Sequence, residues 1–103
     1  WEDFEITFLG SSDWIKGLQE KWNEFVDLKE YIKEKKGKKK SKEIDVRALV
    51  ESGNFEQDVL KVRFSWQEMY LNPLFIVNCI FPGLDLNQFQ MIKTGQYFQE
   101  EKN

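Results

Sequence analysis

The densest group of chemically active side chains in this sequence is a run of lysines. Seven of the ten residues from Lys33 to Lys42 are lysine and one is glutamate, so the run carries a net charge of +6. Because the whole chain carries −3, the residues outside the run carry −9. Lysines can bind phosphates, anionic lipid headgroups or an acidic protein surface. The lysines of this basic patch are Lys35, Lys36, Lys38, Lys39, Lys40 and Lys42.

The composition of the run argues against sequence-specific binding to nucleic acid. It contains no arginine for bidentate contacts to bases and no aromatic residue for stacking. Lysine also suits the negative end of a helix that projects into water. We therefore interpret the Lys-rich loop at 33–43 as the solvated end of a helix with a loop behind it. Electrostatic binding of nucleic acid or of an anionic membrane is the alternative.

Most catalytic and metal chemistry lacks its residues in this sequence. With no histidine and one cysteine, zinc sites, most transition-metal sites and histidine-activated nucleophiles are excluded. Cys79 lies among isoleucine and phenylalanine, which predicts a buried, inert thiol. Glu20, Glu24 and Asp27 fall opposite the apolar stripe of a predicted helix, which predicts solvated carboxylates and no acid–base pair. We expect no catalytic residue, no metal and no cofactor.

The elements that must position these groups begin with a strand and a long helix. Residues 3–9 alternate between apolar and polar side chains, which predicts a half-buried strand. The "SSD" that follows supplies helix-capping oxygens. An apolar stripe then predicts one amphipathic helix over about residues 13–36, ended by Gly37. The stripe consists of Trp14, Leu18, Trp22, Phe25 and Ile32.

The second half of the chain predicts a small antiparallel sheet. Residues 45–52 fit either a strand or a short helix, and we favour the helix. Residues 58–66 alternate like a strand with one wet face, and "LFIVNCIF" over 74–81 is apolar on both faces, which predicts a central strand. A final helix is expected from Asp85 to about Lys93. The predicted fold class is α+β, with a small antiparallel sheet packed against one long helix and a shorter C-terminal helix.

Length and composition predict one domain in a reducing compartment. A chain of 103 residues fits a single domain, and a lone cysteine cannot form an internal disulfide. The first residue is Trp1, so we expect the sequence to be a piece of a longer protein. The longest apolar run is far shorter than the roughly 20 residues of a membrane helix. We expect a cytoplasmic or nuclear location without a membrane span.

The strongest functional indication is aromatic. A central strand over residues 74–81 would present apolar side chains on both faces of the sheet, and one face would need cover from another chain. This predicts a non-catalytic protein–protein interaction module that binds another protein or forms a homodimer. The expected partner-binding residues are Trp66, Tyr70, Phe75, Val77 and Phe81.

The stretch "LKVRFSWQEMYLNPLFIVNCIFPG" resembles the middle of the E2-like folds. The match consists of Tyr70 and Pro73, flanked by an alternating strand before them and an apolar strand after them, and it covers about 24 of the 103 residues. The most similar families are the autophagy-type conjugating enzymes and their non-catalytic relatives, the RWD interaction domains. Conjugating enzymes carry their cysteine after the sheet, and no cysteine follows Cys79. The resemblance therefore implies a non-catalytic member, or a fragment of an enzyme whose cysteine lies outside these residues.

Overall fold

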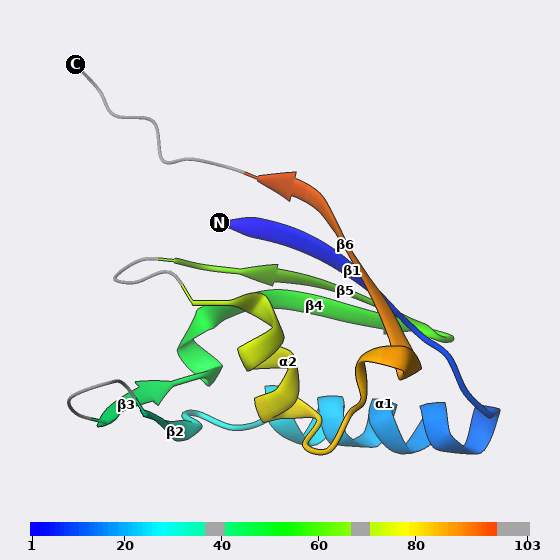
Figure 1. The fold of residues 1–103 in the computed structure, drawn as a ribbon, viewed down its shortest axis with the longest axis horizontal. Coiled ribbons are helices and arrows are strands. Elements are labelled where there is room, and N and C mark those ends of the chain that lie inside the picture. The colour runs from blue at the N-terminus through cyan, green and yellow to red at the C-terminus, as the bar shows by residue number, and fades with distance from the viewer. Residues whose placement is uncertain (37–40, 67–70, 97–103) are drawn as a thin grey trace.

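The fold is α+β, as the sequence predicts (Figure 1). The structure, a computed structural model, describes residues 1–36, 41–66 and 71–96. A four-stranded antiparallel sheet has the order β4-β5-β1-β6, and a separate two-stranded ribbon pairs β2 with β3. The elements are β1 (Glu2–Phe8), α1 (Ser12–Val26), β2 (Ile32–Lys36), β3 (Ser41–Asp45), β4 (Val50–Glu56), β5 (Val59–Phe64), α2 (Pro73–Ile80) and β6 (Phe89–Gln96).

The two strands with clear alternation form the middle of the sheet. Phe4 and Ile6 of β1 lie opposite Val62 and Leu60 of β5, and all four side chains are buried. The intervening polar residues face the other side of the sheet, because successive side chains of a strand point to opposite faces. The predictions for residues 3–9 and 58–66 are therefore confirmed.

Helix α1 begins as predicted but ends about ten residues early. The Ser11 hydroxyl accepts a hydrogen bond from the Trp14 amide at 3.2 Å, which caps the helix. The helix stops at Val26, and residues 32–36 form β2 instead of further helical turns. The prediction of a helix to residue 36 is wrong because strand pairing with β3 outweighs the helix propensity of lysine and glutamate. Gly37, the expected helix stop, lies outside the described residues.

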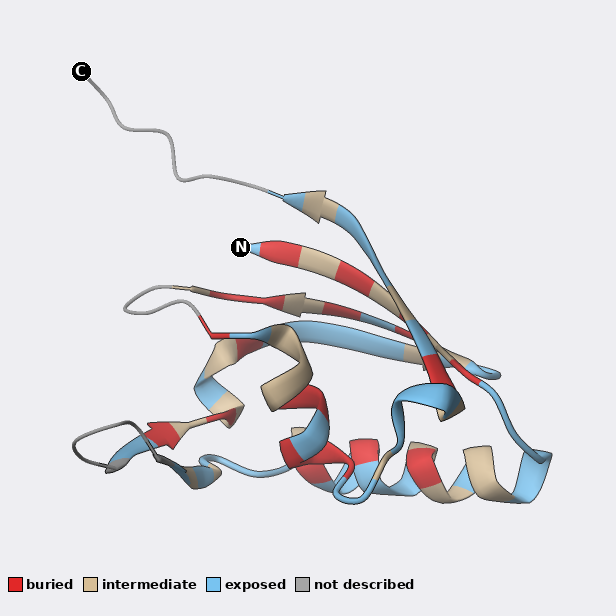
Figure 2. Cartoon of the chain, viewed as in Figure 1, coloured by how far each residue is buried: buried red, intermediate tan, exposed pale blue. Residues whose placement is uncertain are grey.

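The apolar segment 74–81 is a helix, so the predicted central strand is wrong. Asn72 accepts a hydrogen bond from the Leu74 amide at 3.0 Å, and Pro73 occupies the first helical position. Both are strong helix-start signals. Helix α2 is apolar on most sides because it is wedged between the sheet, α1 and the ribbon (Figures 1 and 2). A short apolar run is compatible with either a buried strand or a buried helix.

The predicted C-terminal helix over residues 85–93 is also wrong. Asp85 and Gln88 do form a capping box, but it begins a single 3₁₀ turn over Leu86–Gln88. The chain then extends as β6 and completes the sheet beside β1. The ambiguous segment 45–52 divides in a similar way, into a 3₁₀ turn over Arg47–Leu49 and the first residues of β4.

Both helices cover one face of the four-stranded sheet and leave the other face open (Figure 1). The core lies between the helices and the covered face, and it is rich in aromatic residues (Figure 2). The Phe8 ring lies 5.4 Å from that of Phe55 and 5.3 Å from that of Phe81, measured between centroids. Trp22 of α1 packs directly below Gly53 of β4, and this contact fixes the spacing between helix and sheet.

Candidate binding surfaces

The partner face predicted from the sequence does not exist as a single surface. Val77 and Phe81 are each 1% exposed and lie in the core, so their assignment to a partner is wrong. Phe75 and Trp66 are half-buried at the surface. Tyr70 lies outside the described residues. Phe75, Val77 and Phe81 were expected to share one face of a strand, and the helical conformation of α2 separates Phe75 from the other two.

Trp66 instead completes a buried polar cluster at one end of the sheet. Its indole Nε1 donates to Oε1 of Glu2 at 2.6 Å, and Lys93 Nζ lies 2.7 Å from Oε2 of the same carboxylate. Glu2 is only 5% exposed. A buried carboxylate with partners on both oxygens is a structural ion pair. We therefore assign this cluster to holding β1, β6 and the end of β5 together.

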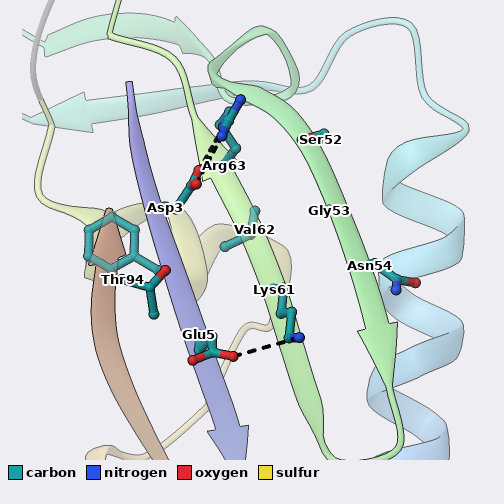
Figure 3. Close-up of a pocket in the computed structure, with 10 residues that line it drawn as sticks. Asp3, Glu5, Ser52, Gly53, Asn54, Lys61, Val62, Arg63 and Thr94 are labelled. Atoms are coloured by element: carbon teal, nitrogen blue, oxygen red, sulfur yellow. Dashed lines mark hydrogen bonds and ion pairs between the residues drawn. The ribbon is translucent and has the colours of Figure 1, made fainter. Parts of the chain in front are cut away.

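The open face of the sheet carries ion pairs between β1 and β5 (Figure 3), and Ile92 of β6 is exposed beside Glu5 on the same face. Arg63 donates two hydrogen bonds to Asp3, at 2.7 and 2.9 Å, and Lys61 lies 3.9 Å from Glu5. The Arg63 hydrogen bonds hold the pKa of the Asp3 carboxyl below its ordinary value of 3.8. A hollow of about 550 Å³ lies over these residues. Because opposite charges face each other across β1 and β5, this surface favours neither anions nor cations.

Cys79 is buried in α2, and burial raises the pKa of its thiol above 9.0. The expectation of a buried thiol is confirmed, although it lies on a helix and not on a strand. Glu20, Glu24 and Asp27 are solvent-exposed, as expected. Within residues 1–36, 41–66 and 71–96, no group of three or more potential metal ligands comes together. No helix in these ranges is long and apolar enough to cross a membrane.

The described lysines of the run lie on a β-ribbon, so the prediction of a helix end is wrong. Lys35 belongs to β2 and lies directly opposite Lys42 of β3, and both are exposed. Lys36 pairs through its backbone with Ser41. Lys38, Lys39 and Lys40 lie outside the described residues. The segment 33–43, predicted as a Lys-rich loop, therefore begins in strand β2 and ends in strand β3.

A groove that sequence analysis did not predict runs between α1 and strand β4. Its volume is about 410 Å³, and α1 lies alongside β4 on the side away from β5 (Figure 3). Its apolar and polar lining residues come from segments about 25 residues apart in the sequence. They are Trp22, Asn23 and Val26 of α1, Arg47 of the 3₁₀ turn, and Val50–Phe55 of β4.

Gly53 makes the close approach of α1 and β4 possible. A Cβ atom at this position would lie 2.4 Å from Cζ2 of Trp22, closer than carbon atoms can pack. The indole therefore lies against bare backbone and forms the floor of the groove. Trp22 is only 3% exposed, so the accessible apolar surface of the groove comes from the half-buried Val26 and Phe55, while exposed Asn23 and Asn54 lie at its rim.

Strand β4 is an edge strand of the sheet, and its register shows which backbone groups are open. The Ser65 amide donates to the Leu49 carbonyl, so odd-numbered residues of β5 face β4. The Phe8 amide donates to the Asp58 carbonyl, which places the even-numbered residues toward β1. Gly53 and Phe55 lie opposite Val62 and Leu60, which are even-numbered residues of β5. Because only alternate residues of an antiparallel pair are hydrogen-bonded to each other, the amides and carbonyls of Gly53 and Phe55 point away from β5.

Arg47 closes one end of the groove. Its guanidinium donates to the carbonyl of Val50 at 3.0 Å and to that of Val26 at 3.3 Å. It also forms a cation–π contact with the ring of Phe25. Among the described residues, its Nε is buried without a hydrogen-bond partner, and no carboxylate forms an ion pair with it. The arginine ties the end of α1 to the start of β4, and it brings positive charge to the groove.

Comparisons with known proteins give no relative for this chain. No protein-family model, no curated protein and no solved structure matches it. The resemblance to the E2-like folds therefore stays a prediction. One of its two flanking strands, residues 74–81, is the helix α2 in the structure, so the resemblance is reduced to the first strand, Tyr70 and Pro73.

Proposed function

We propose that this domain is a non-catalytic, intracellular protein–protein interaction module. It binds an extended segment of another protein, which adds to the sheet as a fifth strand beside β4. The observation that carries the proposal is the combination of an open strand edge with a groove of about 410 Å³ alongside it. In such binding, backbone hydrogen bonds give affinity, and pockets for alternate side chains give specificity.

The contacts of the groove match the two requirements of strand addition. Gly53 and Phe55 offer backbone donors and acceptors two residues apart, which is the repeat of a strand. Side chains of the added segment that point toward α1 would cover the Trp22 indole and Val26, whereas those on the opposite side would meet Ser52 and Asn54. The alternation predicts that the bound segment is apolar on one face and polar on the other.

The other surfaces support a binding role less well. On the open sheet face the charges of Asp3, Glu5, Lys61 and Arg63 are paired, and Cys79 is buried. A catalytic group would need an exposed or perturbed side chain poised beside a cavity. The polar residues that line the groove are an arginine, a glutamate, a serine and two asparagines, and this lining includes neither a histidine nor a cysteine that could act as base or nucleophile.

The test uses a randomised twelve-residue peptide library displayed on phage, because the partner's sequence is not known. The domain should enrich peptides with alternating apolar and polar residues. Asn23→Trp, which fills the groove from an exposed helix position, should weaken their binding at least tenfold. Asn78→Trp is the matched control, since Asn78 is an exposed asparagine of α2 remote from the groove, and it should change binding less than twofold.

Two outcomes would overturn the proposal. One is a selection that enriches no peptide above the level of an uncoated surface. The other is a set of enriched peptides that bind the Asn23→Trp and Asn78→Trp variants equally well. Thermal melts of both variants confirm that the sheet is intact, because each substitution is at a solvent-exposed helix position.

A further inference from the structure

The β2–β3 ribbon places three of its lysines on one face. Residues directly opposite in an antiparallel pair share a face, and so do residues two apart on one strand. Lys33 lies opposite Ile44, and Lys35 lies opposite Lys42, so three lysines and one isoleucine form the first face. Glu34 lies opposite Glu43 on the second face. We call the first of these, with Lys33, Lys35 and Lys42, the lysine face.

This arrangement is locally unfavourable. Like charges directly opposite each other destabilise a strand pair. Exchanging Lys42 and Glu43 in the sequence would convert both repulsive pairs, Lys35–Lys42 and Glu34–Glu43, into attractive ones without changing composition. A sequence that breaks a local rule in this way commonly does so at a functional site. The ribbon therefore keeps Lys33, Lys35 and Lys42 on one side at a cost in stability, while the register places Lys36 on the other side with Glu34 and Glu43.

Aromatic rings hold two of these ammonium groups in place. Lys33 Nζ lies 5.0 Å from the centre of the Tyr31 ring, and Lys35 Nζ lies 5.5 Å from that of Phe75. Ile44 is buried and anchors the lysine face to the core. Within the described parts of the chain, no carboxylate forms an ion pair with Lys33, Lys35 or Lys42. The positive charge is held in position, and the carboxylates of the described residues do not neutralise it.

We infer that the lysine face binds an extended, acidic segment of a protein. Lys33 and Lys35 are two residues apart on one strand, a spacing of about 6.8 Å, which equals the spacing of alternate carboxylates in an extended acidic peptide. Nucleic acid fits less well because the paired residues of the ribbon include no arginine for bidentate contacts to bases, and the neighbouring rings of Tyr31 and Phe75 are each covered by a lysine ammonium group. Residues 32–45 carry +4 and the others carry −7, so the attraction of any anionic segment is confined to the ribbon.

This inference is independent of the groove beside β4, because the two surfaces share no residue. It also gives a role to Phe75, whose half-buried ring supports Lys35. The expected binding is weak and sensitive to salt, since exposed ion pairs are screened over about 10 Å at 0.1 M ionic strength.

The test exchanges two neighbouring residues. The double variant Lys42→Glu/Glu43→Lys keeps the net charge and composition, and it should raise the melting temperature by pairing opposite charges. A fluorescein-labelled decamer of glutamate at 50 mM NaCl should bind the wild type and should bind this variant about tenfold more weakly, because one ion pair is lost and one repulsion is gained. The control Lys16→Glu/Glu20→Lys exchanges exposed residues on α1 and should change binding less than twofold.

Several results would overturn the inference. One is that the wild type does not bind the glutamate decamer. Another is that both exchanged variants lose binding to the same extent. Tighter binding of a deoxythymidine decamer, or of vesicles with one-third phosphatidylserine, would show that the site takes phosphate and not carboxylate. The peptide-library selection tests the β4 groove and the glutamate decamer tests the lysine face. A failure of one test does not affect the other, so the two failures are distinguishable.

Discussion

Truncating Phe81 and Phe75 to alanine, one at a time, distinguishes a helical conformation of residues 74–81 from a strand with one apolar face. If residues 74–81 formed a strand, both rings would lie on the same side and would respond alike. In the structure Phe81 is 1% exposed and its ring centre lies 5.3 Å from that of Phe8, whereas Phe75 is half-buried beneath Lys35. Phe81→Ala and Phe75→Ala therefore report on the local fold directly.

The expected magnitudes follow from burial. Emptying a fully buried phenylalanine site costs about 3–5 kcal/mol, which is a fifth or more of the roughly 5–15 kcal/mol available to a domain of this size. Phe75→Ala removes a partly exposed ring and one cation–π contact worth about 0.5–1 kcal/mol, so its total cost should be about 1–2 kcal/mol. Phe81→Ala should thus be destabilised by at least about 1 kcal/mol more than Phe75→Ala.

Urea titrations followed by tryptophan fluorescence measure both losses in the same conditions. The slope of the free energy of unfolding with urea should stay constant, which would show that the variants change stability and not the extent of unfolding. Equal losses for the two variants, or a larger loss for Phe75→Ala, would refute the packing described for α2.

Two further predictions concern β4 and β1. Gly53→Ala should destabilise the domain by about 1–3 kcal/mol, because its Cβ would overlap the buried Trp22 ring. Gly17 has open space around it, so Gly17→Ala should instead stabilise α1 by about 0.5–1 kcal/mol, and urea titrations compare the two variants. Asp3→Asn should flatten the fall in melting temperature between pH 5 and pH 3. The folded-state pKa of Asp3 lies below its unfolded value near 3.8, so its contribution is complete above that pH and is lost as the pH falls through the lower pKa; an unchanged pH profile would contradict the role of Arg63.

The parts of the fold that the sequence predicts correctly are those with a strong local signal. Alternation over β1 and β5 and the Ser11 cap of α1 each depend on neighbouring residues alone. The errors have different origins. Residues 89–96 form a strand because they pair with β1, which is distant in the sequence, whereas residues 32–36 have good helix formers but pair with the nearby β3 in a hairpin. Residues 74–81 carried local helix-start signals in Asn72 and Pro73, which the apolar pattern outweighed in the prediction.

The candidate sites were predictable only in part. The lysine run was evident in the sequence, but its separation into a positive and a negative face depends on the register of Lys35 with Lys42. The groove could not be predicted, because it forms where Trp22 of α1 meets Gly53 of β4. Gly53 within an otherwise extended stretch was the only local signal, since a glycine in a strand often marks a close approach.

Amide hydrogen exchange along β4, measured by NMR with and without a library-selected peptide, tests strand addition most directly. Gly53 and Phe55 direct their amides away from β5, so both should exchange rapidly in the free domain and become protected when the peptide binds. The Asn54 amide faces β5 and should change little. A peptide that binds without protecting Gly53 and Phe55, or that protects β6 instead, would contradict the proposal that β4 is the binding edge.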